Sequence, residues 1–149
     1  MTQQAPAAPT TEKQNKPLLD FIRVPADYPA EDAYLWGSQC NACGAKFLGD
    51  RVACGKCGSA EPMKEVKFGA DGEIYVYAVV YQATPGLETP YIGAIIDLDD
   101  GVSVRGNVYG LDPTKPDPSW FGKRVKMFTE KVATDKEGND VIAAKFKVV

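Results

Sequence analysis

The chain has 149 residues, a net charge of −3 and 44% hydrophobic residues, which suits one ordinary domain or two small ones in tandem. It contains no histidine, so the commonest general base is missing, together with any Ser-His or Cys-His nucleophile pair. No stretch approaches the roughly 18 apolar residues that span a bilayer, and Met1–Lys16 lacks the apolar core of a secretory signal. We therefore expect a cytoplasmic protein with no membrane partner.

The amino terminus divides into a tail and an arm. Residues 1–16 are polar, contain proline and show no periodicity, which is typical of a disordered tail. Residues 17–36 form an N-terminal arm in which Pro25 and Pro29 prevent a long helix. A short helix is predicted over Leu18–Arg23, because its aliphatic residues would share one side. The favoured interpretation is that the arm folds back on its own domain; the alternative is that it clasps another subunit.

All four cysteines lie within residues 40–57, as two C-x-x-C pairs that are ten residues apart and each followed by glycine. In a chain without an export signal, this spacing favours a metal site over disulfides, and a redox pair would need only one C-x-x-C near a βαβ pattern. We predict a zinc ribbon over residues 37–62, although iron could occupy the same ligands. Four thiolates leave no open position for water or substrate, so the zinc is expected to be structural. The predicted ligands are Cys40, Cys43, Cys54 and Cys57.

From Met63 to Val149 the pattern predicts a five-stranded OB-like barrel after a short lead-in strand. A tight turn is expected at Asp99–Gly101, a hairpin turn at Lys136–Asp140, and a Pro-rich connection at Leu111–Trp120. The overall fold class is therefore mainly β. The predicted strands are residues 63–68, 73–82, 91–99, 102–110, 125–132 and 141–149.

The alternation of apolar residues predicts which side of each strand faces the barrel interior. In strand 73–82 the even-numbered aliphatic residues are expected to point inward and the tyrosines outward, and strands 91–99 and 102–110 alternate in the same way. The predicted interior residues are Ile74, Val76, Ala78, Val80, Ile92, Ala94, Ile96, Leu98, Val102, Val104 and Val108.

A tyrosine stripe is predicted on the opposite face, made of Tyr75, Tyr77, Tyr81 and Tyr91. Small barrels that bind single-stranded nucleic acid stack bases on such rings inside a positively charged groove. Residues 69–149 contain 9 basic and 12 acidic side chains. This net charge of −3 disfavours the binding of a polyanion such as a nucleic acid. Two interpretations stay open: the stripe is covered by this chain's own ribbon or arm, or it is a protein interface, where tyrosine is enriched.

Beyond these patterns, Leu35–Val149 resembles the rubredoxin-like zinc-ribbon/OB-fold proteins that accompany acyl-CoA enzymes of the thiolase superfamily. Two loop positions depart from that family: Gly49-Asp50 stands in place of Pro-Pro, and Gly55 in place of Pro. The motifs that carry the resemblance are Gln39–Gly44, Phe47, Arg51, Cys54–Ser59, Gly69–Tyr75, Thr89–Val102 and Gly122–Val125.

The resemblance implies a non-catalytic accessory subunit in a hetero-oligomer with a thiolase-like catalytic subunit, which would supply the nucleophilic cysteine and the histidine. Members accompany thiolases, including benzoylsuccinyl-CoA thiolase of anaerobic toluene degradation, and thiolase-like aldolases of steroid side-chain breakdown. The CoA thioester would be shared with the partner at a site that this chain helps to form or cap. Lys123, Arg124 and Lys126 could meet the CoA phosphates, or they are a solvated strand edge. The alternative of another class is a stand-alone single-strand nucleic-acid-binding module.

Overall fold

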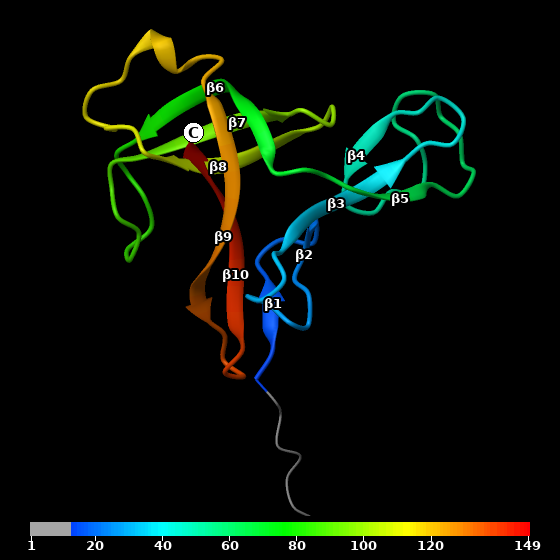
Figure 1. Ribbon diagram of the computed structural model, residues 1–149, viewed down its shortest axis with the longest axis horizontal. Coiled ribbons are helices and arrows are strands. Elements are labelled where there is room, and N and C mark those ends of the chain that lie inside the picture. Colours follow the sequence, from blue (N-terminus) through cyan, green and yellow to red (C-terminus); the bar gives the residue numbers. More distant parts are fainter. Residues whose placement is uncertain (1–12) are drawn as a thin grey trace, which may run out of the picture.

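The computed structural model describes residues 13–149, which form ten strands and one turn of 3-10 helix (Figure 1). The predicted mainly β fold class is confirmed. Within these residues, no helix is long and apolar enough to cross a membrane. The elements are β1 (Asn15–Pro17), β2 (Ile22–Arg23), β3 (Tyr34–Gln39), β4 (Lys46–Leu48), β5 (Lys64–Lys67), β6 (Asp71–Val80), β7 (Tyr91–Leu98), β8 (Ser103–Tyr109), η1 (Pro118–Trp120), β9 (Arg124–Thr134) and β10 (Asp140–Val148).

Strands β6 to β10 close into a barrel in the order β10-β8-β7-β6-β9, with β9 returning to β10. The pairs are antiparallel except for β8 and β10, which run parallel. The predicted turn at Asp99–Gly101 and the Pro-rich connection before β9 are both present. The interior is mainly aliphatic, as the pattern predicted for β7 and β8. The largest fully buried barrel side chains are Ile74, Ile92, Ile96, Val125, Ile142 and Phe146.

In β6 the predicted alternation is wrong beyond Ile74. The register with β7 shifts between Ile74 and Val76, so Tyr75 is an extra residue in a β-bulge. Because side chains alternate with a period of two, one extra residue moves all later side chains to the other face. Val76 is consequently 38% exposed and Ala78 is exposed, whereas Tyr77 packs against the core.

The small sheet is built around β3, which pairs with β2, β4 and β5. The predicted lead-in strand therefore exists, and it pairs with β3 rather than with a barrel strand. At Gly37 a Cβ atom would lie 1.9 Å from the Phe47 carbonyl oxygen, so the close approach of β3 and β4 requires glycine. Leu35 and Phe68 belong to the same buried cluster as the barrel residues, so the two sheets share one core.

The short helix predicted over Leu18–Arg23 is wrong. Here the chain makes turns, and Ile22–Arg23 then forms β2 against β3. Tertiary contacts occupy both ends of the segment, because the Leu18 N–H donates to Ile142 O (2.8 Å) and Phe21 O accepts from the Trp36 N–H (3.0 Å). So short a helix is unstable on its own and cannot compete with these bonds.

The arm folds back on its own barrel, as the favoured interpretation predicted. β1 pairs in parallel with β10, and the Thr129 hydroxyl donates to Tyr28 Oη (3.2 Å). Asn15 and Lys16, predicted as part of the tail, lie in β1. The expectation of disorder for residues 1–12 falls outside the described residues.

Candidate metal centre and neighbouring surfaces

The four cysteines lie on two turns of the same construction. In the first, the Cys40 N–H donates to Ala45 O (2.8 Å) and the Gly44 N–H to Cys40 O (2.9 Å). In the second, the equivalent bonds run from Cys54 to Ser59 (2.9 Å) and from Gly58 to Cys54 (3.0 Å). Both glycines have a φ of 76°, a left-handed conformation that favours glycine. The Cys-Gly sequence after each C-x-x-C is therefore explained by backbone geometry.

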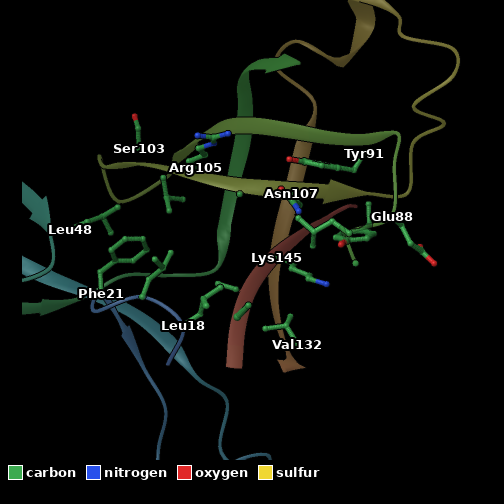
Figure 2. Close-up of a pocket in the computed structure, with 18 residues that line it drawn as sticks. Leu18, Phe21, Leu48, Glu88, Tyr91, Ser103, Arg105, Asn107, Val132 and Lys145 are labelled. Atoms are coloured by element: carbon green, nitrogen blue, oxygen red, sulfur yellow. The ribbon is translucent and has the colours of Figure 1, made fainter. Parts of the chain in front are cut away.

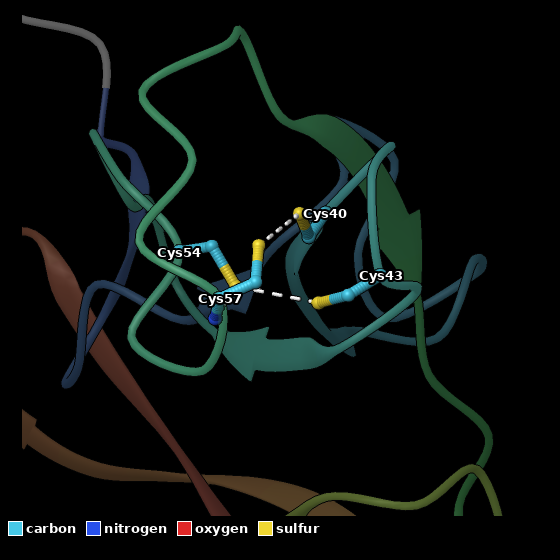
Figure 3. A group of neighbouring side chains, drawn as sticks. All are labelled: Cys40, Cys43, Cys54 and Cys57. Carbon is cyan, nitrogen blue, oxygen red and sulfur yellow. Dashed lines mark hydrogen bonds between the residues drawn. The ribbon is translucent and has the colours of Figure 1, made fainter.

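The two turns bring all four sulfur atoms to within 4.8 Å of one another (Figure 3). Cys40 Sγ lies 3.7 Å from Cys57 Sγ, and Cys43 Sγ lies 3.6 Å from Cys54 Sγ. A tetrahedron with metal–sulfur bonds of about 2.3 Å has sulfur–sulfur edges of about 3.8 Å. The spacing thus fits one tetrahedral ion, and these four residues could hold a metal.

The backbone around Cys54 favours the thiolate that a metal requires. The N–H groups of Cys57 and Lys56 each donate to Cys54 Sγ at 3.4 Å. These bonds, that from Cys57 first, lower the pKa of Cys54 to about 6, although burial of the sulfur opposes the shift. Cys40 and Cys54 are buried, whereas Cys43 and Cys57 reach the surface.

The loop between the two turns shows why the first of the two prolines of the family pattern is missing, at Gly49. Gly49 has a φ of 71°, and its N–H donates to Trp36 O (3.0 Å). Proline has no N–H and a negative φ, so this conformation excludes it. Gly49 O also accepts a hydrogen bond from the buried Ser38 hydroxyl (2.8 Å), which fixes the loop to β3.

The predicted tyrosine stripe is not one continuous surface. Tyr75 and Tyr81 are 64% and 62% exposed. Tyr77 instead packs against Trp120 and Phe121, each with ring centroids 5.0 Å away, and its hydroxyl donates to Asp117 O (3.0 Å). Tyr91 lies opposite Val80 in the β6–β7 register and lines a groove. The bulge at Tyr75 explains why Tyr75 and Tyr77 face opposite sides of the sheet.

The predicted basic cluster is partly neutralised. Arg124 makes a bidentate pair with Asp99, at 2.8 Å and 2.6 Å, and this contact lowers the pKa of Asp99. Lys123 and Lys126 make no ion pair with any residue in the part of the chain that the structure describes. Two of the three predicted phosphate contacts therefore keep a free charge.

An apolar groove that sequence reasoning missed lies between the barrel and the arm (Figure 2). It has a volume of about 850 Å³. Its walls come from β8, β10, the end of β9, the β6–β7 loop and the arm, which are far apart in the sequence. No local pattern marks it, because each contributing segment alone looks like an ordinary strand or turn. Representative lining residues are Leu18, Phe21, Leu87, Tyr91, Arg105 and Val132.

Residues 65–130 match the family described as ChsH2, C-terminal OB-fold domain. Over 116 residues the chain is 34% identical to a DUF35 domain-containing scaffold protein of Methanothermobacter thermautotrophicus, an alignment that covers 76% of this chain and 84% of the relative. The chain belongs to the DUF35 domain family. The family resemblance seen in the sequence motifs is thereby confirmed.

This DUF35 protein is also similar to a thiolase subunit and to an aldolase of known structure. It is 28% identical over 131 residues to the benzoylsuccinyl-CoA thiolase subunit BbsA of Geobacter metallireducens, covering 87% of this chain and 84% of the subunit. Among solved structures, the Ltp2-ChsH2(DUF35) aldolase is similar, with a TM-score of 0.59 and 25% identity over 77% of this chain and 84% of that one.

Proposed function

We propose that this protein is a non-catalytic accessory subunit of a thiolase-type acyl-CoA enzyme complex, in which it helps to form or cap the acyl-CoA site. The observation that carries the proposal is that all four cysteines lie in one cluster. The chain has four cysteines and no histidine, and all four sulfurs gather in one cluster suited to a metal. No free thiol or imidazole then remains for nucleophilic or general-base chemistry. The thiolase subunit and the aldolase to which the chain is similar indicate the class of partner.

Zinc is the ion that we propose for the cluster. The donor set is four sulfurs with tetrahedral spacing, a combination that zinc favours and iron can share. When bound, the ion would cross-link the two turns and hold the loop around Gly49 and Arg51 in place. Because all four positions are taken by protein, its role is structural.

The CoA thioester would lie between this chain and the catalytic subunit. Lys123 and Lys126 are the proposed contacts to the CoA phosphates, since Arg124 is already held by Asp99. A matched test compares Lys123→Gln with Lys115→Gln, which changes an exposed lysine of the Pro-rich connection. The proposal predicts a higher KM for acyl-CoA in the complex with Lys123→Gln and an unchanged KM with Lys115→Gln. Equal KM values for the two variants would remove Lys123 from the site.

The thiolase and aldolase alternatives differ in the reaction of the partner and not in the role of this chain. A stand-alone nucleic-acid module is disfavoured by the acidic barrel and by the loss of a continuous aromatic stripe. We expect no measurable binding of single-stranded DNA at physiological salt in a fluorescence-anisotropy titration. Sub-micromolar binding with steep salt dependence would instead favour the nucleic-acid function.

Complex formation tests the proposal. The tagged chain is co-expressed with a thiolase-like subunit from the same organism, and the mass of the purified product is measured. The proposal predicts a stoichiometric complex that survives size-exclusion chromatography, from wild type and from the surface variant Lys136→Gln alike. Separate elution of the two chains at micromolar concentration would contradict it.

A further inference from the structure

The apolar groove arises because β8 and β10 pair at one end only. Their parallel register joins Val108 to Phe146 and Tyr109 to Lys147, and then the strands separate. The space between them, toward the start of β8, is the groove of about 850 Å³ (Figure 2). The groove is thus bordered by the edges of β8 and β10, two strands of the same barrel.

Both strand edges present backbone groups to the groove. The Leu98 N–H donates to Val102 O, which sets the alternation of the β7–β8 ladder. By that alternation, Ser103, Arg105 and Asn107 direct their N–H and C=O groups away from β7. In the described residues 13–149, no strand pairs with this edge of β8 before Val108. On β10, pairing with β1 ends at Ile142.

The walls above these edges are apolar and exposed. Leu18 and Leu87 are 53% and 62% exposed, although both are large aliphatic side chains. Tyr109 and Val132 add to the same surface and are each 41% exposed. Native proteins usually protect a free strand edge with charged residues or a covering loop. Here the edge lies in an apolar groove, which favours pairing with another chain.

The groove is lined by three charged side chains, which differ in whether they have a partner of opposite charge. Lys145 is paired with Glu130, whereas Arg105 has no carboxylate within 4.0 Å among the described residues. Glu88 lies on the β6–β7 loop, away from Arg105 (Figure 2). A matching occupant carries a carboxylate near Arg105. This complementarity, with the regularly spaced free backbone groups, favours an extended polypeptide over a plain alkyl chain, which offers no hydrogen bonds.

We propose that the groove is the docking site for an extended segment of the catalytic subunit, which adds as a strand along Ser103–Asn107 of β8. The segment alternates apolar and polar residues and places an acidic side chain beside Arg105. Its backbone bonds to β8 give affinity, and its apolar side chains fill the wall near Leu18 and Leu87. This inference rests on the proposed accessory-subunit function and names the surface that the partner recognises.

Amide hydrogen exchange tests this docking without any substitution. In the free protein, the Ser103, Arg105 and Asn107 amides should exchange rapidly, whereas those of Val104, Gly106 and Val108 are held by β7. In the complex with the co-expressed thiolase-like subunit, the first three should slow by about tenfold or more. A complex that forms while these amides stay as fast as in the free protein would overturn the inference and leave the proposed function intact. Absence of any complex would overturn both.

A backbone variant gives a second test. Ser103→Pro removes one groove-facing N–H at the first residue of β8, where proline is tolerated, and Ser103→Ala removes the same side chain but keeps the N–H. Both lose the bond to Asp97 (2.5 Å), so they are matched. The inference predicts equal melting temperatures and about tenfold weaker partner binding for Ser103→Pro alone. If the proline variant melts lower, Arg105→Leu against Arg105→Lys supplies the comparison, with weaker binding expected for leucine.

Other occupants give different outcomes. A second copy of this chain would protect the three amides in the absence of partner, with protection that rises with protein concentration. Residues 1–12 would protect them at all concentrations, and deletion of those residues would release them. Either result would contradict docking of the catalytic subunit in this groove.

Discussion

Residues 40–62 bury no aliphatic or aromatic side chain completely, whereas the barrel buries Ile74, Ile96, Val125 and Phe146 almost completely. The first region brings four sulfurs to within 4.8 Å of one another, and the second has a continuous, mainly aliphatic core. So short a segment cannot bury enough surface to fold by itself, so the proposed metal would supply its folding free energy. The barrel needs no such ion. The proposed metal and the aliphatic core would thus stabilise different parts of the chain, and each can be tested by its own substitution.

The largest expected effect is the loss of the metal. Cys54→Ser removes one ligand, and the free energy of binding a structural zinc is on the order of 10 kcal/mol or more. We expect the wild type to carry about one zinc per chain and the variant to lose both the metal and the ordered residues 40–62. Barrel amides should stay protected. Elemental analysis and amide exchange measure the two responses.

Ser59→Ala is the matched control, because it changes the same turn and keeps all four thiols. It should retain the metal. A folded wild type with four titratable free thiols and no tightly bound zinc or iron would contradict a metal-dependent ribbon.

Next in size is the barrel core. Phe146 is 1% exposed and contacts the position of Gly106, where a Cβ would lie 2.6 Å from the phenyl ring. Phe146→Ala should lower the free energy of unfolding by about 3–5 kcal/mol, through lost burial and the cavity left behind. Denaturant unfolding monitored by tryptophan fluorescence measures it. Val149→Ala, at an exposed terminal residue, should change stability little, and a similar loss in both variants would show that Phe146 is not a core residue.

Tyr77→Ala gives a smaller effect and separates packing from binding. The variant loses two aromatic contacts and the bond to Asp117, so we expect a destabilisation of about 2 kcal/mol. Tyr75→Ala, on the exposed bulge, should leave the melting temperature nearly unchanged. If Tyr75 and Tyr81 belong to the partner interface, Tyr75→Ala should weaken the complex while Tyr77→Ala acts mainly through stability. A lower melting temperature for Tyr75→Ala than for Tyr77→Ala would show that Tyr77 is not part of the packed core.

The smallest effect is a dependence on pH at the β9–β10 hairpin. Partial burial of Asp135 raises the pKa of its carboxyl group. Hydrogen bonds from Asn139 and the contact with Lys16 outweigh that effect and lower the pKa from 3.8 to about 2. A lowered pKa means that the carboxylate stabilises the folded state above pH 4 and that this contribution disappears as the pH falls toward 2. The stability difference between wild type and Asp135→Asn should therefore shrink from pH 5 to pH 2. A constant difference would contradict the assignment.

The sequence was sufficient for the features that depend on local patterns. The four sulfurs meet as the two C-x-x-C pairs predicted, and β7 and β8 face the core with the predicted residues. The features it missed depend on tertiary contacts. The bulge at Tyr75 reversed the alternation of β6, and backbone hydrogen bonds with Ile142 and Trp36 replaced the predicted helix at Leu18–Arg23.

The neutralisation of Arg124 by Asp99 and the groove beside β8 were beyond prediction for the same reason. Each joins segments more than twenty residues apart, and neither segment alone carries a signal. An ion pair or groove of this kind follows only from the strand order of the closed barrel.

Reconstituted turnover is the most direct test of the accessory-subunit function. The purified chain is titrated into the thiolase-like subunit at fixed acyl-CoA concentration, and thiolysis or retro-aldol cleavage is followed. We predict that the chain alone has no activity, because its thiols are all in the metal cluster and it has no histidine, and that the rate rises to a plateau at a fixed ratio of the two subunits. Turnover by this chain without any partner, or a partner whose rate is unaffected by adding it, would contradict the proposed function.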